Sequence, residues 1–370
     1  MNVEKSLPLV IGVDLGGTQL RVAVLRGSEV RSRVDLPTAE APTPSRIIQC
    51  IYSAIEHVLD EAETSLDQIT GIGLAVAGPL DSRTGVVFAP PNLPGWDHVP
   101  LGDIFEKHYN IPVFVENDAN GAGLGEYMFG AGRGSKDMVY LTISTGIGGG
   151  VIVNGQIMQG TSGTAAELGH MIIDWRHGEY CNCGNTGCLE SIASGTAIAR
   201  RANEAIARGV NLLPLGNDEP EYGAMMPGWS ILSAHKHSHI NKLEPQPPVD
   251  ARAVARAARA GIPEARKIIE DAAEAIGIGL VNIIHIFNPD TIILGGGLTQ
   301  MDESLFMEPA LRIVHERTMK VPREATDIVL AQLGMDSGLI GAGALVYYHQ
   351  GKIGSSQCEE QPREAMASLH

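Results

Sequence analysis

The order of apolar and polar positions in the first third of the chain predicts alternating strands and helices. Residues 9–14 (LVIGVD) are apolar and rich in β-branched residues, and residues 20–25 (LRVAVL) follow a glycine turn, so together they predict a pair of strands. Apolar residues recur at helical spacing over residues 47–59, with Thr43 as a suitable N-cap and Pro44 at the first helical position. Two further strands are predicted at residues 70–76 and 112–115.

The second half of the chain repeats this design. Residues 138–144 (MVYLTIS) predict a strand, residues 145–150 a glycine-rich turn, and residues 151–157 (VIVNGQI) a second strand. The similarity is an echo of the N-terminal hairpin and not a short-period repeat. The remaining predicted elements are a helix at 192–208 closing at Gly209, a long helix after Pro263, strands at 291–294 and 327–331, and a helix at 338–348. This alternation is typical of an α/β fold.

Two segments depart from the pattern. Residues 211–248 contain six prolines and no periodicity, which predicts an inserted loop. Residues 353–370 are polar and predict a loosely held tail. The alternating histidines of the insertion are interpreted as solvated side chains and not as a metal site. They are His235, His237 and His239.

Composition favours two folded domains. A chain of 370 residues exceeds the usual size of one core, and 44% hydrophobic with 19% charged residues is typical of folded proteins. The 27 basic and 43 acidic residues leave a formal charge of −16, which argues against nonspecific binding to nucleic acid or to an anionic membrane. The first apolar stretch is too short for a signal peptide, and no apolar run approaches the roughly 18 residues of a membrane span, so we expect a cytoplasmic protein.

Three glycine-rich sites are candidates for binding a nucleotide. Glycines leave backbone N–H groups open to phosphate oxygens, and a carboxylate beside them suits hydrated Mg²⁺. The first two sites are hairpins of similar make that we expect to clamp a triphosphate from both sides of a cleft, although an ordinary turn is the alternative for either one alone. The third follows a strand and suits an adenosine moiety. The residues are Asp14, Gly16, Gly17 and Thr18; Thr145 and Gly146 within residues 144–150; and Gly295, Gly296 and Gly297.

Asn117 and Asp118 stand at the end of a predicted strand. A kinase that phosphorylates a hydroxyl group needs a carboxylate within hydrogen-bond reach of the attacking oxygen, to accept its proton. Asp118 suits that role. Asparagine and aspartate are also preferred N-cap residues, so the start of a helix is the alternative interpretation.

Three of the five cysteines fall within eight residues. Cys181, Cys183 and Cys188 form, with His170, a Cys₃His set that suits tetrahedral Zn²⁺. The Cys-x-Cys spacing is tighter than the common finger spacing, so on spacing alone reduced thiols are the alternative. His177 is a possible competing ligand, but no partner spacing supports it.

Seven motifs resemble, in the same order, those of the ROK family of sugar kinases within the actin-like, ribonuclease-H-like ATPase superfamily. They are DLGGT (14–18), AGPLD (77–81), ENDAN (116–120), STGIGGG (144–150), ELGH (167–170), CNCGNTGCLE (181–190) and ILGGG (293–297). The resemblance covers nearly the whole chain except the insertion and the tail. It implies an α/β fold of two ribonuclease-H-like domains with an interdomain active-site cleft. The smaller domain would comprise residues 1–118 plus 337–352, and the larger one residues 119–336.

The resemblance also implies roles for the candidate residues. Asp118 would be the catalytic base, and the glycine sites would hold MgATP. The sugar would be bound by Asn117, Glu167, His170 and Glu190, with Asn92 and Gly78 as weaker candidates. CNCGNTGC matches the family's Cys-x-Cys-Gly-x-x-Gly-Cys, so the zinc would be structural, orienting His170 and fixing the segment that carries Glu190. The first hairpin departs from a common family form, with Gln19 in place of a lysine.

The expected activity is ATP-dependent phosphorylation of the 6-hydroxyl of D-glucose, because CLESIASGTAI (188–198) is most similar to the glucokinase branch. The alternatives are a kinase for mannose, fructose, N-acetylglucosamine or N-acetylmannosamine, or one that uses polyphosphate, for which the sequence shows no obvious Lys/Arg cluster. A sugar-sensing regulator is the non-enzyme alternative. Because the first predicted strand begins at about Leu9, we expect no DNA-binding domain before it. A homodimer is the family expectation.

Overall fold

The computed structural model describes residues 3–38, 43–90, 93, 95–212 and 248–351. It contains two five-stranded sheets of identical topology. In each sheet three strands form an antiparallel meander. A fourth strand pairs in parallel with the first strand of the meander, and a fifth pairs in parallel with the fourth. The first sheet has the order β3 (Glu29–Pro37), β2 (Gln19–Arg26), β1 (Leu9–Leu15), β4 (Ile69–Val76) and β8 (Val113–Asn117). The second has the order β11 (Gln156–Ile157), β10 (Ile147–Val153), β9 (Met138–Ile143), β12 (Thr291–Gly295) and β13 (Asp327–Leu330). The predicted echo between the two halves is therefore confirmed at the level of topology.

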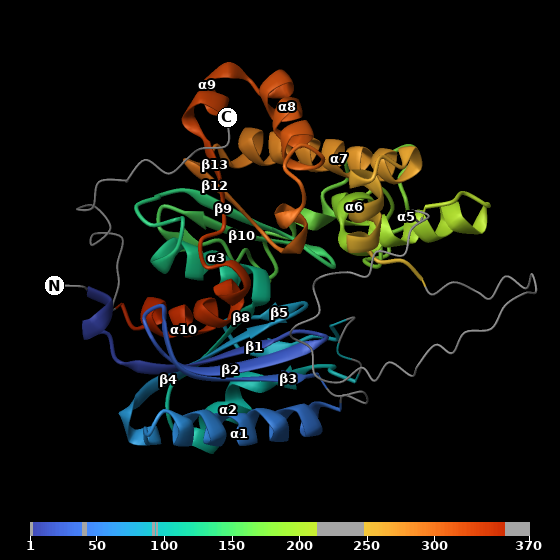
Figure 1. Ribbon diagram of the computed structural model, residues 1–370. Coiled ribbons are helices and arrows are strands. Elements are labelled where there is room, and N and C mark those ends of the chain that lie inside the picture. The colour runs from blue at the N-terminus through green and yellow to red at the C-terminus, as the bar shows by residue number, and fades with distance from the viewer. Residues whose placement is uncertain (1–2, 39–42, 91–92, 94, 213–247, 352–370) are drawn as a thin grey trace, which may run out of the picture.

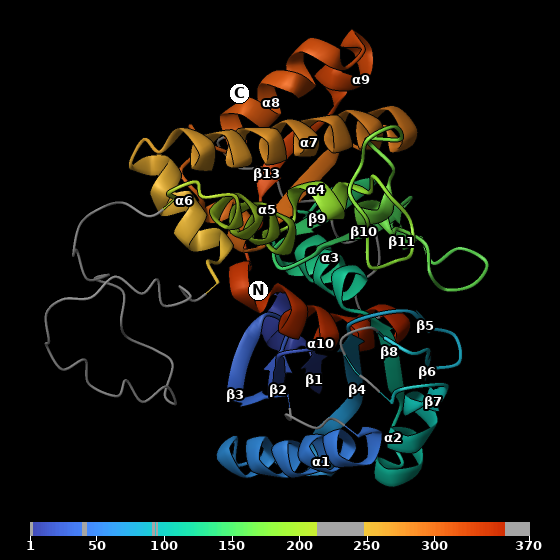
Figure 2. The ribbon, with the colours of Figure 1, turned by 90° about the vertical axis from the view of Figure 1, so that its right-hand side faces the viewer.

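The elements form five layers, which Figures 1 and 2 show from two sides. Helices α1 (Pro44–Glu61) and α2 (Leu101–Tyr109) cover the outer face of the first sheet, and α3 (Asp118–Phe129) and α10 (Ser337–His349) lie between the two sheets. The outer side of the second sheet carries α4 (Leu189–Ala193), α5 (Gly195–Ala207), α6 (Ala251–Arg259) and α7 (Pro263–Phe287). Beyond α7 lie α8 (Met307–Arg317) and α9 (Lys320–Ala325), and a small three-stranded sheet comprises β5 (Leu80–Asp81), β6 (Val86–Val87) and β7 (Val99–Pro100).

The central helices α3 and α10 approach one another backbone against backbone. A Cβ added at Gly341 of α10 would overlap with the carbonyl oxygen of Gly121 in α3, and one added at Gly125 would lie 3.0 Å from the Cα of Gly341. A Cβ at Gly73 of β4 would overlap with the carbonyl oxygen of Ala342. Every residue of α3 after Asp118 is buried, so this glycine-rich segment is helical because both of its sides are packed, and not because of its propensity.

The predicted strands and most of the predicted helices are confirmed to within a few residues. Thr43 caps α1 by accepting a hydrogen bond from the N–H of Arg46, and Pro44 begins the helix. One prediction is wrong: the helix expected at 192–208 is broken at Ser194, whose extended backbone ends α4 and whose side chain caps α5. A second correction concerns residues 145–150, because Ile147–Val153 is already strand β10 and the turn itself is only three residues long.

The predicted insertion lies almost wholly outside the described residues, together with its three histidines, and the predicted tail lies outside them as well. Among the helices of the described residues, none is long and apolar enough to cross a lipid bilayer.

Candidate functional site

The first hairpin turn joins β1 to β2 at the carboxyl end of β1. The N–H of Gly16 donates to the carbonyl of Gln19 (2.9 Å), and the hydroxyl of Thr38 donates to the carbonyl of Gly16 (2.7 Å), so the turn is held from both sides. Asp14 and Arg21 are direct cross-strand partners in this hairpin. Their side chains form an ion pair of 3.3 Å, which fixes the Asp14 carboxylate immediately before the turn.

Burial raises the pKa of Asp14 to about 6, against an ordinary value of 3.8. The Arg21 guanidinium opposes the shift, and the charge of Asp118 adds to it. Asp14 and Asp118 are thus close enough to repel one another, although 104 positions separate them in sequence. Register explains the proximity: Leu15 pairs with Val76 and Val76 with Asn117, so the carboxyl ends of β1, β4 and β8 meet at one edge of the sheet.

The second hairpin turn, Ser144 to Gly146, joins β9 to β10. It rests on the start of α5: the N–H of Gly195 donates to the carbonyl of Ser144 (2.7 Å), and the hydroxyl of Thr196 donates to the carbonyl of Thr145 (2.8 Å). The break at Ser194 that sequence periodicity did not predict is what allows α5 to present its first residues to this turn.

The third glycine site follows β12, and packing accounts for two of its three glycines. A Cβ at Gly295 would overlap with the Tyr140 hydroxyl, and Gly296 has a φ of +89° with no room for a Cβ beside Ile143. Gly297 faces open space, since a Cβ added there would have no atom within 4 Å. Of these three glycines, Gly297 is therefore the one that a ligand can approach closely.

Asn117 and Asp118 join β8 to α3. The Oδ1 of Asn117 accepts hydrogen bonds from the N–H groups of Ala119 (2.9 Å) and Asn120 (3.3 Å), so Asn117 is the N-cap of α3. Its Nδ2 donates to the carbonyl of Gly78 (3.3 Å), which brings that glycine to the site. The capping alternative thus holds for Asn117, and it leaves the carboxylate of Asp118 at the first residue of the helix.

Asp118 is half-buried, and this burial raises its pKa, while a hydrogen bond from the Ala119 N–H (2.9 Å) opposes the shift. A raised pKa makes a carboxylate a stronger base than an exposed aspartate, as long as it is ionised at the working pH. Asp118 also contributes to the raised pKa of Glu167, whose causes are burial first, with His170 opposing and Asp118 and Glu190 adding to it. These carboxylates therefore surround one region.

Glu190 approaches that region from α4, and Glu167 from the position just before the 3₁₀ turn Leu168–His170. The N–H of Ile147, the first residue of β10, donates to Oε2 of Glu190 (2.8 Å), and a Cβ at Gly146 would lie only 2.6 Å from the same oxygen. A side chain at Gly146 would therefore displace the Glu190 carboxylate from this position. Glu167 lies 3.8 Å from Nε2 of His170 and is half exposed, with 50% of its side chain accessible.

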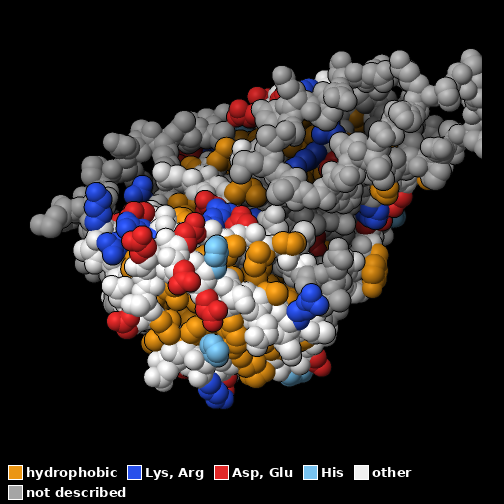
Figure 3. Space-filling view, turned by 60° about the horizontal axis from the view of Figure 1, so that its bottom comes forward, with side chains coloured by type: hydrophobic (Ala, Val, Ile, Leu, Met, Phe, Trp, Pro, Cys, Tyr) orange, Lys and Arg blue, Asp and Glu red, His pale blue; other side chains and the backbone are white. Residues whose placement is uncertain are grey.

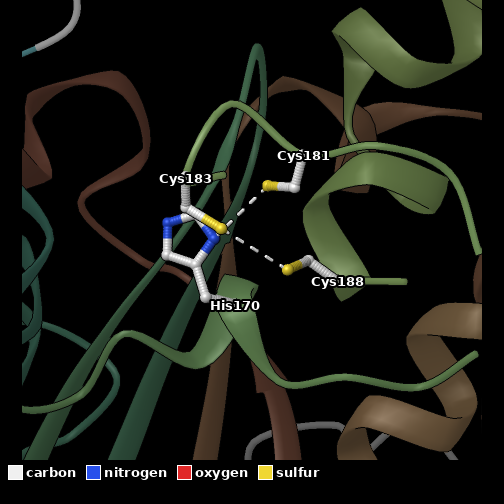
Figure 4. A group of neighbouring side chains, drawn as sticks. All are labelled: His170, Cys181, Cys183 and Cys188. Atoms are coloured by element: carbon white, nitrogen blue, oxygen red, sulfur yellow. Dashed lines mark hydrogen bonds between the residues drawn. The ribbon is translucent and has the colours of Figure 1, made fainter. Parts of the chain in front are cut away.

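The Cys₃His set converges on one point, as Figure 4 shows. The four ligand atoms all lie within 4.8 Å of one another, with Cys181 Sγ 3.6 Å from His170 Nδ1 and Cys183 Sγ 3.7 Å from Cys188 Sγ. Zinc ligands at about 2.0–2.3 Å from the ion stand about 3.5–3.8 Å apart at the corners of a tetrahedron, so the set fits Zn²⁺. Since Nδ1 faces the thiols, Nε2 remains turned toward Glu167.

The backbone of the cysteine loop explains how this set forms. Gly184 and Gly187 both have positive φ values (+91° and +77°), which the two tight turns of CNCGNTGC require. His177 is not among the four residues whose ligand atoms meet here. Its backbone N–H donates to the carboxylate of Asp174 (3.0 Å). Cys188 ends the loop and is the N-cap of α4, so the metal-ligand set leads directly into the helix that carries Glu190.

Two buried glutamates have structural roles that the sequence did not predict. Glu116 accepts hydrogen bonds from the side chains of Asn120 (3.1 Å) and Gln159 (2.8 Å), and so fixes the β8–α3 junction. Burial raises its pKa. Glu126 accepts from three backbone N–H groups and from the Ser337 hydroxyl, which ties α3 to the start of α10. A charge within an apolar stretch was the available signal for both.

Two arginines of strand β3, which could in principle face a polyphosphate chain, make ion pairs with acidic residues. Arg33 pairs with Asp35 and Asp336, and Arg31 pairs with Glu29. On the face shown in Figure 3, Lys and Arg side chains are interspersed with acidic ones. Asn92, a weak sugar candidate, lies outside the described residues.

Comparison with known proteins gives a consistent result. Residues 10–349 match the ROK family model. A glucokinase of Halalkalibacterium halodurans is 34% identical over 91% of this chain and 94% of its own. The ROK hexokinase of Thermus thermophilus has a TM-score of 0.73 and 33% identity, covering 93% of this chain and all of that one. A ROK family glucokinase of Streptomyces griseus, solved in complex with glucose and AMPPNP, has a TM-score of 0.69 and 32% identity over 91% of this chain and 98% of that one.

Proposed function

The chain belongs to the ROK family and is a sugar kinase with the two-domain actin-like fold. From this premise we propose that it is a glucokinase, which transfers the γ-phosphoryl group of MgATP to the 6-hydroxyl of D-glucose. The observation that carries the proposal is the gathering of carboxylates around Asp118: Asp14 comes from β1, Glu167 from the start of the 3₁₀ turn Leu168–His170, and Glu190 from α4. Asp14 would hold the cation that accompanies the phosphates, and Glu167 and Glu190 would accept hydrogen bonds from the sugar hydroxyls.

Asp118 is the proposed general base. It accepts the proton of the attacking 6-hydroxyl as the oxygen–phosphorus bond forms and the bond to the β-phosphate bridging oxygen breaks. Its position at the first residue of α3 is supported by the N-cap Asn117 and by the buried Glu116 network behind the β8–α3 junction. Its raised pKa strengthens it as a base.

The proposed sugar-binding residues are Asn117, Glu167, His170 and Glu190, with Gly78 beside them. Carboxylates with two acceptor oxygens suit adjacent hydroxyl groups. The side chain of Asn117 bonds the Gly78 carbonyl, and Nε2 of His170 points toward Glu167, so two of these four side chains are already oriented by neighbours in the site. The assignment to glucose itself is supported by the glucokinases among the relatives.

The two hairpin turns and the end of β12 are the proposed MgATP site. Asp14 would hold the hydrated Mg²⁺, whose charge offsets that of the phosphates. Backbone N–H groups at Gly16, Gly17 and Thr18 and at Thr145 and Gly146 would contact the phosphate oxygens. Near Gly295, Gly296 and Gly297, the open surface of Gly297 suits the nucleoside.

A structural Zn²⁺ held by His170, Cys181, Cys183 and Cys188 completes the proposal. All four positions of a tetrahedral ion would be filled by protein, so the ion would orient and not react. With Nδ1 on the metal, His170 keeps Nε2 for the sugar side. We also propose the domain division at residues 1–118 plus 337–352 against 119–336, in which each domain contains one of the two sheets, and a homodimeric assembly by analogy with the family.

The test is a coupled ADP-release assay on purified protein with MgATP and a panel of glucose, mannose, fructose, N-acetylglucosamine and N-acetylmannosamine. Polyphosphate is tested as donor by direct detection of the sugar phosphate. Glucose is expected to give the highest kcat/KM with ATP. Preference for another sugar, or for polyphosphate, contradicts the substrate or donor assignment, and no turnover with any pair contradicts the kinase in favour of a sugar-sensing regulator.

Asp118→Asn in the same assay tests the mechanism. Loss of the general base is expected to lower kcat by about 10²–10⁴ while the KM for glucose changes little. The matched control is Asp67→Asn, which changes an exposed aspartate of the short 3₁₀ helix Leu66–Gln68. Turnover at the wild-type rate in Asp118→Asn removes this residue from the role of base.

A further inference from the structure

One short segment of the chain makes several hydrogen bonds to the second hairpin turn. Residues 189–196, which we term the clasp, contain α4, the break at Ser194 and the first two residues of α5. The turn that it grips, residues 144–147, is the proposed phosphate-binding hairpin. The two segments are far apart in sequence, and no strand pairing joins them.

Four hydrogen bonds connect the clasp to the turn. Oε2 of Glu190 accepts from the N–H of Ile147 (2.8 Å), and the N–H of Gly195 donates to the carbonyl of Ser144 (2.7 Å). Thr196 contributes the other two, because both its N–H (3.2 Å) and its hydroxyl (2.8 Å) donate to the carbonyl of Thr145. The turn is therefore held at each of its ends and at its centre.

Thr196 is the informative member of this set. Its side chain is exposed, so water could satisfy its hydroxyl at no cost, yet the hydroxyl is directed at the backbone of Thr145. A threonine side chain has few χ1 rotamers, so a bond made by its hydroxyl restrains the partner more than one made by a freely rotating group. No catalytic or ligand-binding role explains this bond.

We propose that Thr196 is a positioning residue for the phosphate-binding hairpin, and that the clasp couples sugar binding to nucleotide binding. The inference rests on the proposed function, which places a sugar at Glu190 and phosphates at residues 144–147. It differs from a general closure of domains because both ends of the coupling lie within the part of the chain around the second sheet.

Glu190 supplies the coupling. Its Oε2 is committed to the Ile147 N–H, so Oε1 is the oxygen that remains for a sugar hydroxyl. A sugar that immobilises this carboxylate also immobilises its hydrogen bond to the hairpin. The hairpin is then already ordered when the nucleotide binds, so nucleotide binding loses less conformational entropy. By linkage, the nucleotide must raise the affinity for sugar by the same factor.

The experiment compares Thr196→Val with Thr196→Ser. Valine keeps the shape and removes the hydroxyl donor, whereas serine keeps the donor. Thr326→Val is the matched control, since the Thr326 hydroxyl also donates to backbone carbonyls of the same part of the protein, but at the opposite edge of the second sheet, where β13 begins. Calorimetry gives the Kd of MgADP with and without saturating glucose, and steady-state kinetics give KM for each substrate and kcat.

Thr196→Val is expected to weaken MgADP binding by about three- to tenfold, the usual effect of one lost hydrogen bond. The Kd of glucose alone should change by less than about twofold. The enhancement of MgADP affinity by glucose should fall, because Glu190 holds only the end of the turn at Ile147, and the bond that ties its centre at Thr145 to the clasp is lost. Thr196→Ser and Thr326→Val should behave as the wild type. Thermal melts of all variants show whether a loss of binding follows a loss of folded protein.

Three outcomes overturn the inference: unchanged MgADP affinity in Thr196→Val, an undiminished effect of glucose on that affinity, or the same loss in Thr196→Ser. Failure of the proposed function is a different result. In that case the wild-type protein itself binds no MgADP or shows no response to glucose or any other sugar of the panel, which overturns both proposals together.

Discussion

Replacement of Asp14 by asparagine tests whether the buried, ionised carboxylate before the first hairpin turn lowers the stability of the folded protein. In the folded protein burial raises the pKa of this carboxyl from 3.8 to about 6, even with Arg21 beside it. A carboxyl whose pKa is raised on folding favours the folded state only when protonated, so the stability it confers is lost as the pH rises from 3.8 toward 6. At about 1.4 kcal/mol per pKa unit, the full loss is about 3 kcal/mol.

The assay measures the difference in Tm between Asp14→Asn and the wild type at pH 4.5 and at pH 7.5. Asparagine does not ionise, so the stability of the variant does not fall for this reason as the pH rises. In the wild type, about 2 kcal/mol of the roughly 3 kcal/mol of stability is lost between these two pH values. If the part of the protein around the first sheet unfolds as one unit, the gap should widen in favour of the variant by about 4–8 °C. Asp60→Asn, at an exposed position of α1, measures the effect of losing a surface carboxylate.

The same variant should bind MgADP more weakly, because asparagine cannot supply the negative charge that Mg²⁺ requires. Higher stability together with weaker binding is the expected pattern for a residue kept for its function. A gap in Tm that stays constant between the two pH values, or one that narrows as the pH rises, refutes the argument that burial of an ionised Asp14 costs stability.

Three further outcomes are expected. Cys183→Ser should abolish the one zinc per chain that elemental analysis of the purified protein is expected to find, and should lower the Tm, whereas a metal-free wild-type protein contradicts the site. Gly341→Ala should destabilise the protein by several kcal/mol in chemical denaturation because its methyl group meets the Gly121 carbonyl, and a neutral effect would show that the helices can separate there. Glu126→Gln should cost about 2 kcal/mol or more, since its amide nitrogen cannot accept the bonds from backbone N–H groups that one carboxylate oxygen now takes, and an unchanged Tm would contradict that account.

Local signals predicted much of the fold. The strands on both sides of each glycine turn and the capped start of α1 follow from periodicity and from Thr43 and Pro44. For α3 the N-cap preference of Asn117 and Asp118 was the available signal for its start. Its alternate glycines disfavour a helix, and the contacts of both its sides make it one. The break at Ser194 was missed for a related reason, since it depends on bonds to a turn about 50 residues earlier.

For the candidate site, too, the sequence predicted some features and missed others that depend on contacts between distant segments. Residue type and motif order predicted that Asp118, Glu167 and Glu190 belong together, and the charges of Asp118 and Glu190 are near enough to Glu167 to add to the raised pKa of that residue. They could not predict that Gly295 and Gly296 are required by packing against neighbouring strands. Nor could they predict that Glu190 bonds the second hairpin, because that contact depends on how α4 is set against β10.

The position of α10 has a consequence for the order in which the chain folds during synthesis. Leu339 and Tyr347 of this helix pack on Val10 and Leu25, and the Tyr347 hydroxyl donates to the carbonyl of Pro8 (2.9 Å). Among the described residues, β1 and β2 are the first two strands and α10 is the last helix, so these strands are synthesised long before the helix that covers one of their faces. Until about residue 349 has emerged, this apolar face has no native partner from α10, so the nascent chain is a natural substrate for chaperones that bind exposed apolar strands.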